Sequence, residues 1–252
     1  MNVQTLFHGI DRERPVPLYS QIKQQILQRI SEGALKLGDP LPSETEICTE
    51  LNISRPTVRQ AMGDLVAEGY LSRMKGKGTF VSQPKIEGGF FQKLQSFDEE
   101  MQQKGLVPST KVLSLAQIEG NAPLCEKLQL PEGAPLVFLE RLRFANGEPI
   151  VWVETYLPYE RFPKLLRVDF ECHSLYRELK QTYLTPVERV VREIEATNAS
   201  YHEAELLNIK PNAAICFVTT VSYDFSNKPV EYSRAHYRGD RNQFRVELHR
   251  SN

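Results

Sequence analysis

The stretch "SRPTVRQAMGDLVAEG", residues 54–69, decides the fold of the first part of the chain. Ser54 is a suitable residue to cap a helix, and Gly69 is a suitable residue to end one. Between them, apolar residues recur at three- and four-residue spacing, which predicts one buried stripe: Val58, Ala61, Met62, Leu65 and Val66. Arg55 and Arg59 lie off that stripe. The stretch therefore predicts a helix with two arginines on its outer surface, close to its beginning.

Two further helices are predicted before this one. "PLYSQIKQQILQRISEG" has apolar residues four apart, and "LPSETEICTELN" begins with a capping box formed by Ser43 and Glu46. The short connection "NIS" then leads into the helix that follows Ser54. Two short helices joined in this way form a helix-turn-helix, whose second helix can lie in the DNA major groove. Many helical bundles also have short turns, so this pattern alone does not establish DNA binding.

The segment "YLSRMKGKGTFVSQ" predicts a hairpin with a basic tip. Gly76 and Gly78 allow positive backbone torsions, and Lys75 and Lys77 place positive charge at the turn. Residues 54–83 contain five basic and two acidic residues, although the whole chain has a net charge of −1. A basic hairpin after a helix-turn-helix predicts a winged helix that meets phosphates. The alternative is an ordinary solvated surface.

The composition indicates a globular protein with two domains. The chain has 252 residues, of which 40% are hydrophobic and 25% charged. The apolar runs are too short to span a membrane, and the N-terminus lacks a secretory signal, so we expect a cytoplasmic protein. The four cysteines are scattered, which predicts free thiols and neither a disulfide framework nor a metal site: Cys48, Cys125, Cys172 and Cys216.

The N-terminal motifs together resemble the winged-helix head of GntR-type bacterial transcription regulators. The resemblance rests on "PLYSQIKQQILQRI", "LKLGDPLPSETEI", "SRPTVRQAMGDLVAEGYL" and "KGKGTFV". It implies that residues 1–83 bind a short palindromic DNA operator as a homodimer. The positions that it implies for DNA contact, including those that shape the wing, are Ser43, Glu44, Ser54, Arg55, Thr57, Arg59, Lys75, Gly76, Lys77 and Gly78.

Beyond residue 83 the pattern changes. "SQPKIEGG" predicts a linker at residues 84–92, and residues 93–252 alternate strand-like and helical runs. Asn146 and Gly147 predict a tight turn between two of the strands. We expect an α+β domain built on an antiparallel sheet.

Several polar residues lie in these strands. Arg141 and Arg143 are two residues apart, so both side chains leave the same face of their strand. With Ser174 near a helix start they could hold a phosphate, and Glu154 and Glu231 could accept hydrogens from sugar hydroxyls. The alternative is a solvent-facing strand with ordinary cross-strand ion pairs. Spacing alone favours that alternative.

The segments "ERLRFANGEPIVWVETYLP" and "KPVEYSRAHYRGDRNQF" resemble the UTRA effector domain of the HutC-like branch of GntR-type regulators. The resemblance covers most of residues 90–248. It implies a fold similar to chorismate lyase and a pocket for a small molecule, often a phosphorylated sugar. The residues that it implies for effector binding, including backbone amides near the first two, are Ser96, Phe97, Arg141, Arg143, Glu154, Ser174, Tyr176, Glu231 and Tyr237.

These patterns predict a dimeric repressor that a small anionic effector, such as a phosphorylated amino sugar, releases from DNA. The effector could instead be a carboxylate. A lyase-like enzyme is a second hypothesis, but the sequence has no metal-ligand cluster, phosphate-binding glycine loop or GxSxG elbow. A third is a constitutive DNA-binding or scaffold protein with a vestigial pocket. We expect no cofactor.

Overall fold

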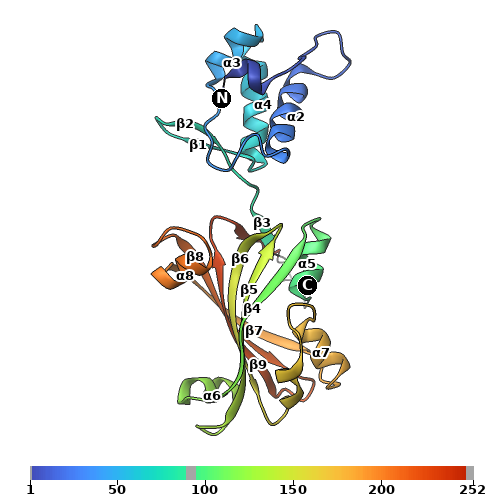
Figure 1. The fold of residues 1–252 in the computed structure, drawn as a ribbon, viewed down its shortest axis with the longest axis vertical. Coiled ribbons are helices and arrows are strands. Elements are labelled where there is room, and N and C mark those ends of the chain that lie inside the picture. Colours follow the sequence, from blue (N-terminus) through green and yellow to red (C-terminus); the bar gives the residue numbers. More distant parts are fainter. Residues whose placement is uncertain (1, 89–94, 248–252) are drawn as a thin grey trace, which may run out of the picture. The chain divides into compact units, whose positions relative to one another are not determined.

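The structure is a computed structural model that describes residues 2–88 and 95–247 (Figure 1). The chain forms two compact units, Met1–Lys85 and Ile86–Asn252, and each unit has its own core. Among the described residues, no helix is both long enough and apolar enough to cross a membrane.

The first unit contains four helices and a two-stranded antiparallel hairpin. Their bounds are α1 Val3–Leu6, α2 Leu18–Ser31, α3 Glu44–Leu51, α4 Arg55–Ala67, β1 Leu71–Met74 and β2 Gly78–Val81. The three helices and the hairpin expected from the sequence are present in the expected order. Helix α1 was not expected, and its Val3 and Leu6 are buried in the same core as Ile22, Ile47 and Leu65.

The ends of α3 and α4 lie at the residues that the sequence predicted, and one predicted hydrogen bond differs. Ser43 and Glu46 form the predicted capping box at the start of α3. The predicted cap at Ser54 is wrong in its detail. The Ser54 hydroxyl lies 2.7 Å from the Thr57 hydroxyl and, within the described part of the chain, caps no amide of α4. At the other end, Gly69 adopts the positive φ of 82° that lets the chain leave α4.

The second unit is built on a six-stranded antiparallel sheet in the order β4-β5-β6-β9-β8-β7. The strands are β4 Pro108–Glu119, β5 Pro135–Ala145, β6 Glu148–Pro158, β7 Arg189–Asn198, β8 Ala214–Tyr223 and β9 Pro229–Arg238. The helices are α5 Phe97–Gln103, α6 Ala122–Leu128, η1 Pro163–Arg167, α7 Leu175–Gln181 and α8 Tyr201–Leu206. Helices α5 and α7 lie on one face of the sheet, and α6 and α8 lie on the other (Figure 1).

A short parallel strand pair closes the second unit. Strand β3, Ile86–Gly88, pairs with β10, Asn242–Phe244, and Ile86 is buried against Met101 and Ile150. Part of the segment expected as a linker is therefore a strand of this unit. Residues 89–92 of that segment lie outside the described residues.

Candidate DNA-binding surface and effector pocket

The beginning of α4 presents its polar side chains to solvent. Arg55 and Arg59 are exposed on the side of α4 away from the core, because Val58, Ala61 and Met62 occupy the buried side. Of the ten positions that the sequence implied for DNA contact, eight are exposed: Ser43, Ser54, Arg55, Arg59, Lys75, Gly76, Lys77 and Gly78. Glu44 and Thr57 are half-buried.

Glu44 already has a cationic partner. Its Oε1 lies 2.8 Å from Nη2 of Arg73, which extends from β1 of the hairpin. Glu44 therefore connects the start of α3 to the wing and is not simply a free group that faces solvent. Sequence reasoning missed Arg73, although its position directly before "MKGKG" in a basic hairpin was a usable signal.

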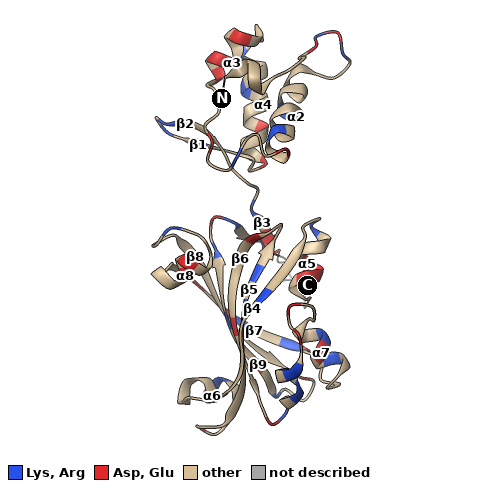
Figure 2. Ribbon diagram, viewed as in Figure 1, with Lys and Arg blue, Asp and Glu red and all other residues tan. Residues whose placement is uncertain are grey.

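The wing has the backbone that its sequence predicted. Gly76 and Gly78 have φ values of 74° and 113°, which side-chain-bearing residues rarely adopt. Lys75 and Lys77 are exposed beside them, and Figure 2 shows basic residues at the tip of the β1–β2 hairpin. This tip can approach a phosphate backbone closely.

A cavity of about 120 Å³ lies on the face of the sheet that α5 and α7 cover. Eight of the nine residues expected to bind an effector line it: Ser96, Phe97, Arg141, Arg143, Ser174, Tyr176, Glu231 and Tyr237. They come from four elements, β5, β9, α5 and α7, and from the N-cap positions of the two helices, which the fold brings together although they are far apart in the sequence.

Arg141 is a buried cation of this cavity whose hydrogen bonding is incomplete. Its side chain is only 3% exposed, and its Nη2 donates a hydrogen bond of 3.3 Å to Thr155. Its Nε has no hydrogen-bond partner among the described residues. Burial, and then the neighbouring guanidinium of Arg143, lower the pKa of Arg141 well below its usual value. A buried cation with an unsatisfied donor is costly unless an anion joins it.

Arg143 is the second cation of the cavity, and Asp98 is the acidic group that opposes the effect of burial on it most. Burial lowers its pKa, and its guanidinium carbon lies 5.0 Å from the centre of the Phe97 ring. A cation over an aromatic face gains some stabilisation without losing its charge. Two adjacent guanidinium groups have the chemistry to bind a planar or tetrahedral anion.

Two residues of the cavity, Tyr176 and Glu231, belong to a hydrogen-bonded chain that ends in a carboxylate. The Tyr176 and Ser222 hydroxyls lie 3.2 Å apart, and Ser222 donates to Glu231 at 2.8 Å. Glu231 is only 3% exposed. Burial raises the pKa of Tyr176 and of Tyr237, so both phenols remain protonated, and Tyr176 donates its proton to Ser222. Such groups can orient the hydroxyls of a polar ligand.

Known protein families match both units of the chain. Residues 18–81 match the family "Bacterial regulatory proteins, gntR family", and residues 103–243 match the UTRA domain. The chain belongs to the gntR family and has a UTRA effector domain. Among its relatives is the HTH-type transcriptional repressor NagR of Bacillus subtilis (strain 168), which is 34% identical over 94% of this chain and 96% of that protein.

Two further similarities concern the whole chain. The mannosyl-D-glycerate transport/metabolism system repressor MngR of Escherichia coli (strain K12) is 31% identical over 90% of this chain and 94% of its own. The crystal structure of PhnF from Mycobacterium smegmatis superposes with a TM-score of 0.72 at 30% identity, covering 89% of this chain and 98% of that one. This gntR-family protein is therefore a DNA-binding transcription regulator and not an enzyme.

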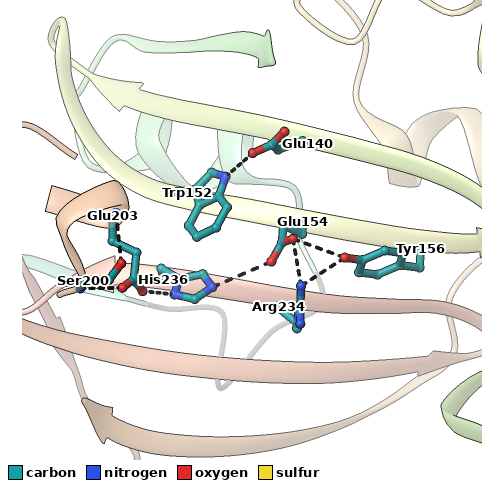
Figure 3. A network of polar contacts seen from close by, with 8 residues as sticks. All are labelled: Glu140, Trp152, Glu154, Tyr156, Ser200, Glu203, Arg234 and His236. Atoms are coloured by element: carbon teal, nitrogen blue, oxygen red, sulfur yellow. Dashed lines mark hydrogen bonds and ion pairs between the residues drawn. The ribbon is translucent and has the colours of Figure 1, made fainter. Parts of the chain in front are cut away.

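One expected site residue of this gntR-family regulator is in the wrong place. Glu154 does not line the cavity; it lies on the opposite face of the sheet (Figure 3). It accepts hydrogen bonds from Arg234 at 2.8 Å and from Tyr156 at 3.2 Å. Directly paired residues share a face, and Glu154 is paired with Glu140 and Arg234, whereas Arg141 is paired with Val153. The assignment of Glu154 to the effector site was wrong.

The backbone of Ser96 also differs from expectation. Its amide donates to Glu99 at 3.0 Å, and its hydroxyl accepts from the Glu99 amide, so this capping box uses both groups. Ser96 lines the cavity, but its amide is directed to Glu99 and not to a ligand. Ser174, at the start of α7, uses its hydroxyl for no cap within residues 2–88 and 95–247.

The gntR-family regulator also has pocket residues that sequence reasoning missed. Besides several apolar residues, they include Glu100, Arg192, Thr220 and Ser233. Ser233 lies two residues after Glu231 in β9, so both side chains face the same side of the sheet. The two-residue period of a strand was therefore a sufficient signal for Ser233. Arg192 extends from β7, and its contribution could not be foreseen because the position of β7 beside β8 is a property of the fold.

Proposed function

We propose that this regulator is a repressor that binds a palindromic operator as a homodimer and leaves it when an anionic effector fills the cavity. In this proposal Arg55 and Arg59 contact base edges, and Lys77 contacts the backbone. Two winged heads one helical turn apart match a two-fold symmetric operator. The relatives NagR and MngR are both repressors, which supports the direction of regulation.

The observation that supports the effector proposal is the unsatisfied Nε of the buried Arg141, next to the guanidinium of Arg143. Folding places two like charges together in a cavity, where Glu231 and Asp98 offset them in part and a bound anion would stabilise both further. A phosphate with two charges and three acceptor oxygens fits both groups better than a single carboxylate does.

We further propose that the effector is a phosphorylated sugar derivative. Glu231, Tyr176 and Tyr237 place a carboxylate and two phenol hydroxyls in the same cavity as the arginines, which suits a ligand with hydroxyl groups. One relative is named for mannosyl-D-glycerate and another for fructoselysine utilization, and both compounds contain a sugar. A carboxylate effector remains the second candidate because two guanidinium groups also bind carboxylates.

Thermal unfolding of the purified protein tests the proposal. We expect glucosamine 6-phosphate and related sugar phosphates to raise the unfolding temperature, and glucosamine at the same concentration to have no effect. Ligand at a hundred times its dissociation constant should stabilise the folded protein by about 2.7 kcal/mol. Stabilisation by simple dicarboxylates and by no sugar phosphate would favour the carboxylate alternative. Dimerisation is tested separately by sedimentation with operator DNA, where one chain per duplex at saturation would contradict it.

A further inference from the structure

The loop before α2, residues 11–16, is held in one shape by a buried side chain. Gln21 is 6% exposed and makes three hydrogen bonds to the ends of this loop. Its Nε2 donates to the carbonyl of Asp11 at 2.7 Å and to that of Val16 at 2.8 Å, and its Oε1 accepts from the Asp11 amide at 3.0 Å. The buried side-chain amide of Gln21 thus hydrogen-bonds to backbone groups at both ends of the loop. These bonds fix the conformation of the loop between them.

Arg12 extends from this loop to the turn of the helix-turn-helix. Its guanidinium donates to the backbone carbonyl of Asn52, the residue with a φ of 52° that ends α3. Asn52 is two residues before Ser54, where α4 begins. A carbonyl carries no net charge, so Arg12 keeps its positive charge at this position, and its side chain is exposed.

The second arginine of the loop is arranged differently. Arg14 lies 3.6 Å from the carboxylate of Asp11, which also accepts a hydrogen bond of 2.9 Å from the Glu13 amide. Asp11 and Arg14 therefore partly balance each other within the loop. Glu13 is exposed and lies next to Arg12 in the sequence. Its negative charge therefore reduces the attraction of this loop for an anion.

We propose that Arg12 binds a DNA phosphate beside the base pairs that the first turn of α4 contacts. A recognition helix uses its N-terminal residues for base edges, and the groove that holds it is only about 12 Å wide. A guanidinium fixed at the turn just before that helix is thus within reach of the phosphates on the groove wall. The inference rests on DNA binding by the head and not on the identity of the effector.

The test measures the binding constant of the full-length protein for a short random-sequence duplex at several salt concentrations. Fluorescence anisotropy of the labelled duplex monitors binding. Loss of one phosphate contact should reduce the slope of log K against log salt by about 0.9. We expect this reduction for Arg12→Ala, and a wild-type slope for Arg12→Lys, which keeps the charge. Glu13→Gln should tighten binding. Arg167→Ala, which removes an exposed arginine of the second unit, is the matched control and should leave the slope unchanged.

A structural role would give a different result. If Arg12 only fastens the loop to the turn, Arg12→Ala lowers the unfolding temperature without DNA and leaves the salt slope at its wild-type value. That outcome, or an equal change of slope in Arg167→Ala, overturns the proposal. If the wild type itself binds neither random duplex nor operator, DNA binding by the head fails as a whole, which is a distinguishable result.

Discussion

The two faces of the central sheet differ in how their charged groups are paired, although the same three strands, β5, β6 and β9, contribute residues to both. On the face under α5 and α7, Arg141 has an unsatisfied nitrogen and a second guanidinium as its neighbour. On the other face, Glu154 binds Arg234 and Tyr156, while His236 binds Glu203 at 2.6 Å (Figure 3). On the first face, neither guanidinium group is hydrogen-bonded to a carboxylate among the described residues, whereas on the second face Arg234 is bonded to Glu154, although the Nε of Arg234 also has no partner there.

The difference distinguishes a binding site from a structural network. The face of Figure 3 also packs its groups tightly, because Trp152 stacks on His236 at 4.5 Å between ring centres and donates to Glu140 at 2.9 Å. Glu203 connects His236 to α8 through the Ser200 capping box. This network holds α8 on the sheet. On the cavity face, no carboxylate among the described residues is hydrogen-bonded to Arg141, and we propose that the effector supplies that anion.

The largest effect should come from the arginines of the cavity. Replacing Arg141 or Arg143 by Ala should weaken effector binding by about 2–5 kcal/mol, because the anion loses a buried charged partner. Operator binding without effector should remain at the wild-type level, so both variants should repress even when effector is present. Titration of operator complexes with the sugar phosphate that stabilises the wild type measures this. Release at the wild-type effector concentration would place the anion site elsewhere.

A pair of isosteric changes then compares the two faces directly. Glu154→Gln should lower the free energy of unfolding by about 1.5–3 kcal/mol, because hydrogen bonds to a charged group are lost, and should leave effector affinity unchanged. Glu231→Gln should weaken effector binding, since its carboxylate faces the cavity. Urea unfolding and ligand titration of both variants provide the two readouts. Loss of effector affinity in Glu154→Gln would contradict the assignment of the two faces.

Sequence reasoning went furthest where local chemistry determines the structure. The capping box at Ser43, the turn at Asn146 and Gly147, and the glycines of the wing all appear as predicted. Arg141 and Arg143 share a face because a strand has a two-residue period. The family resemblance, which its motifs indicated, is confirmed.

The error at Glu154 has a definite physical cause. The tight turn pairs Ala145 with Glu148 and Phe144 with Pro149, and continuing that register would place Glu154 on the face of Arg141. A bulge shifts the register by one residue between Phe144 and Arg143, so that Arg143 is paired with Val151. A shift of one residue turns every later side chain of β6 to the other face. Nothing in the local sequence identified that bulge.

A smaller effect is expected from the hydrogen bond between Trp152 and Glu140. Trp152→Phe keeps a large ring against His236 but removes the indole N–H that donates to Glu140. A hydrogen bond to a charged group contributes about 1.5–3 kcal/mol to the free energy of unfolding, and less where water reaches the carboxylate. The free energy of unfolding should fall by less than in Glu154→Gln, and effector affinity should not change. An effector response lost in Trp152→Phe would show that the network takes part in ligand binding.

The smallest effect should appear as a dependence of stability on pH. Burial lowers the pKa of His236 below its ordinary value of 6.5, despite the opposing effect of Glu203 and Glu154. A base whose pKa is lower in the folded state binds fewer protons there than in the unfolded state, so stability rises with pH between the two values. The folded protein should therefore lose stability as the pH falls from 6.5 through the folded pKa. His236→Gln should flatten this part of the profile, while carboxylates such as Glu203 still titrate at lower pH. Urea unfolding of both proteins across this range measures the difference, and parallel profiles would show that His236 does not titrate as its burial predicts.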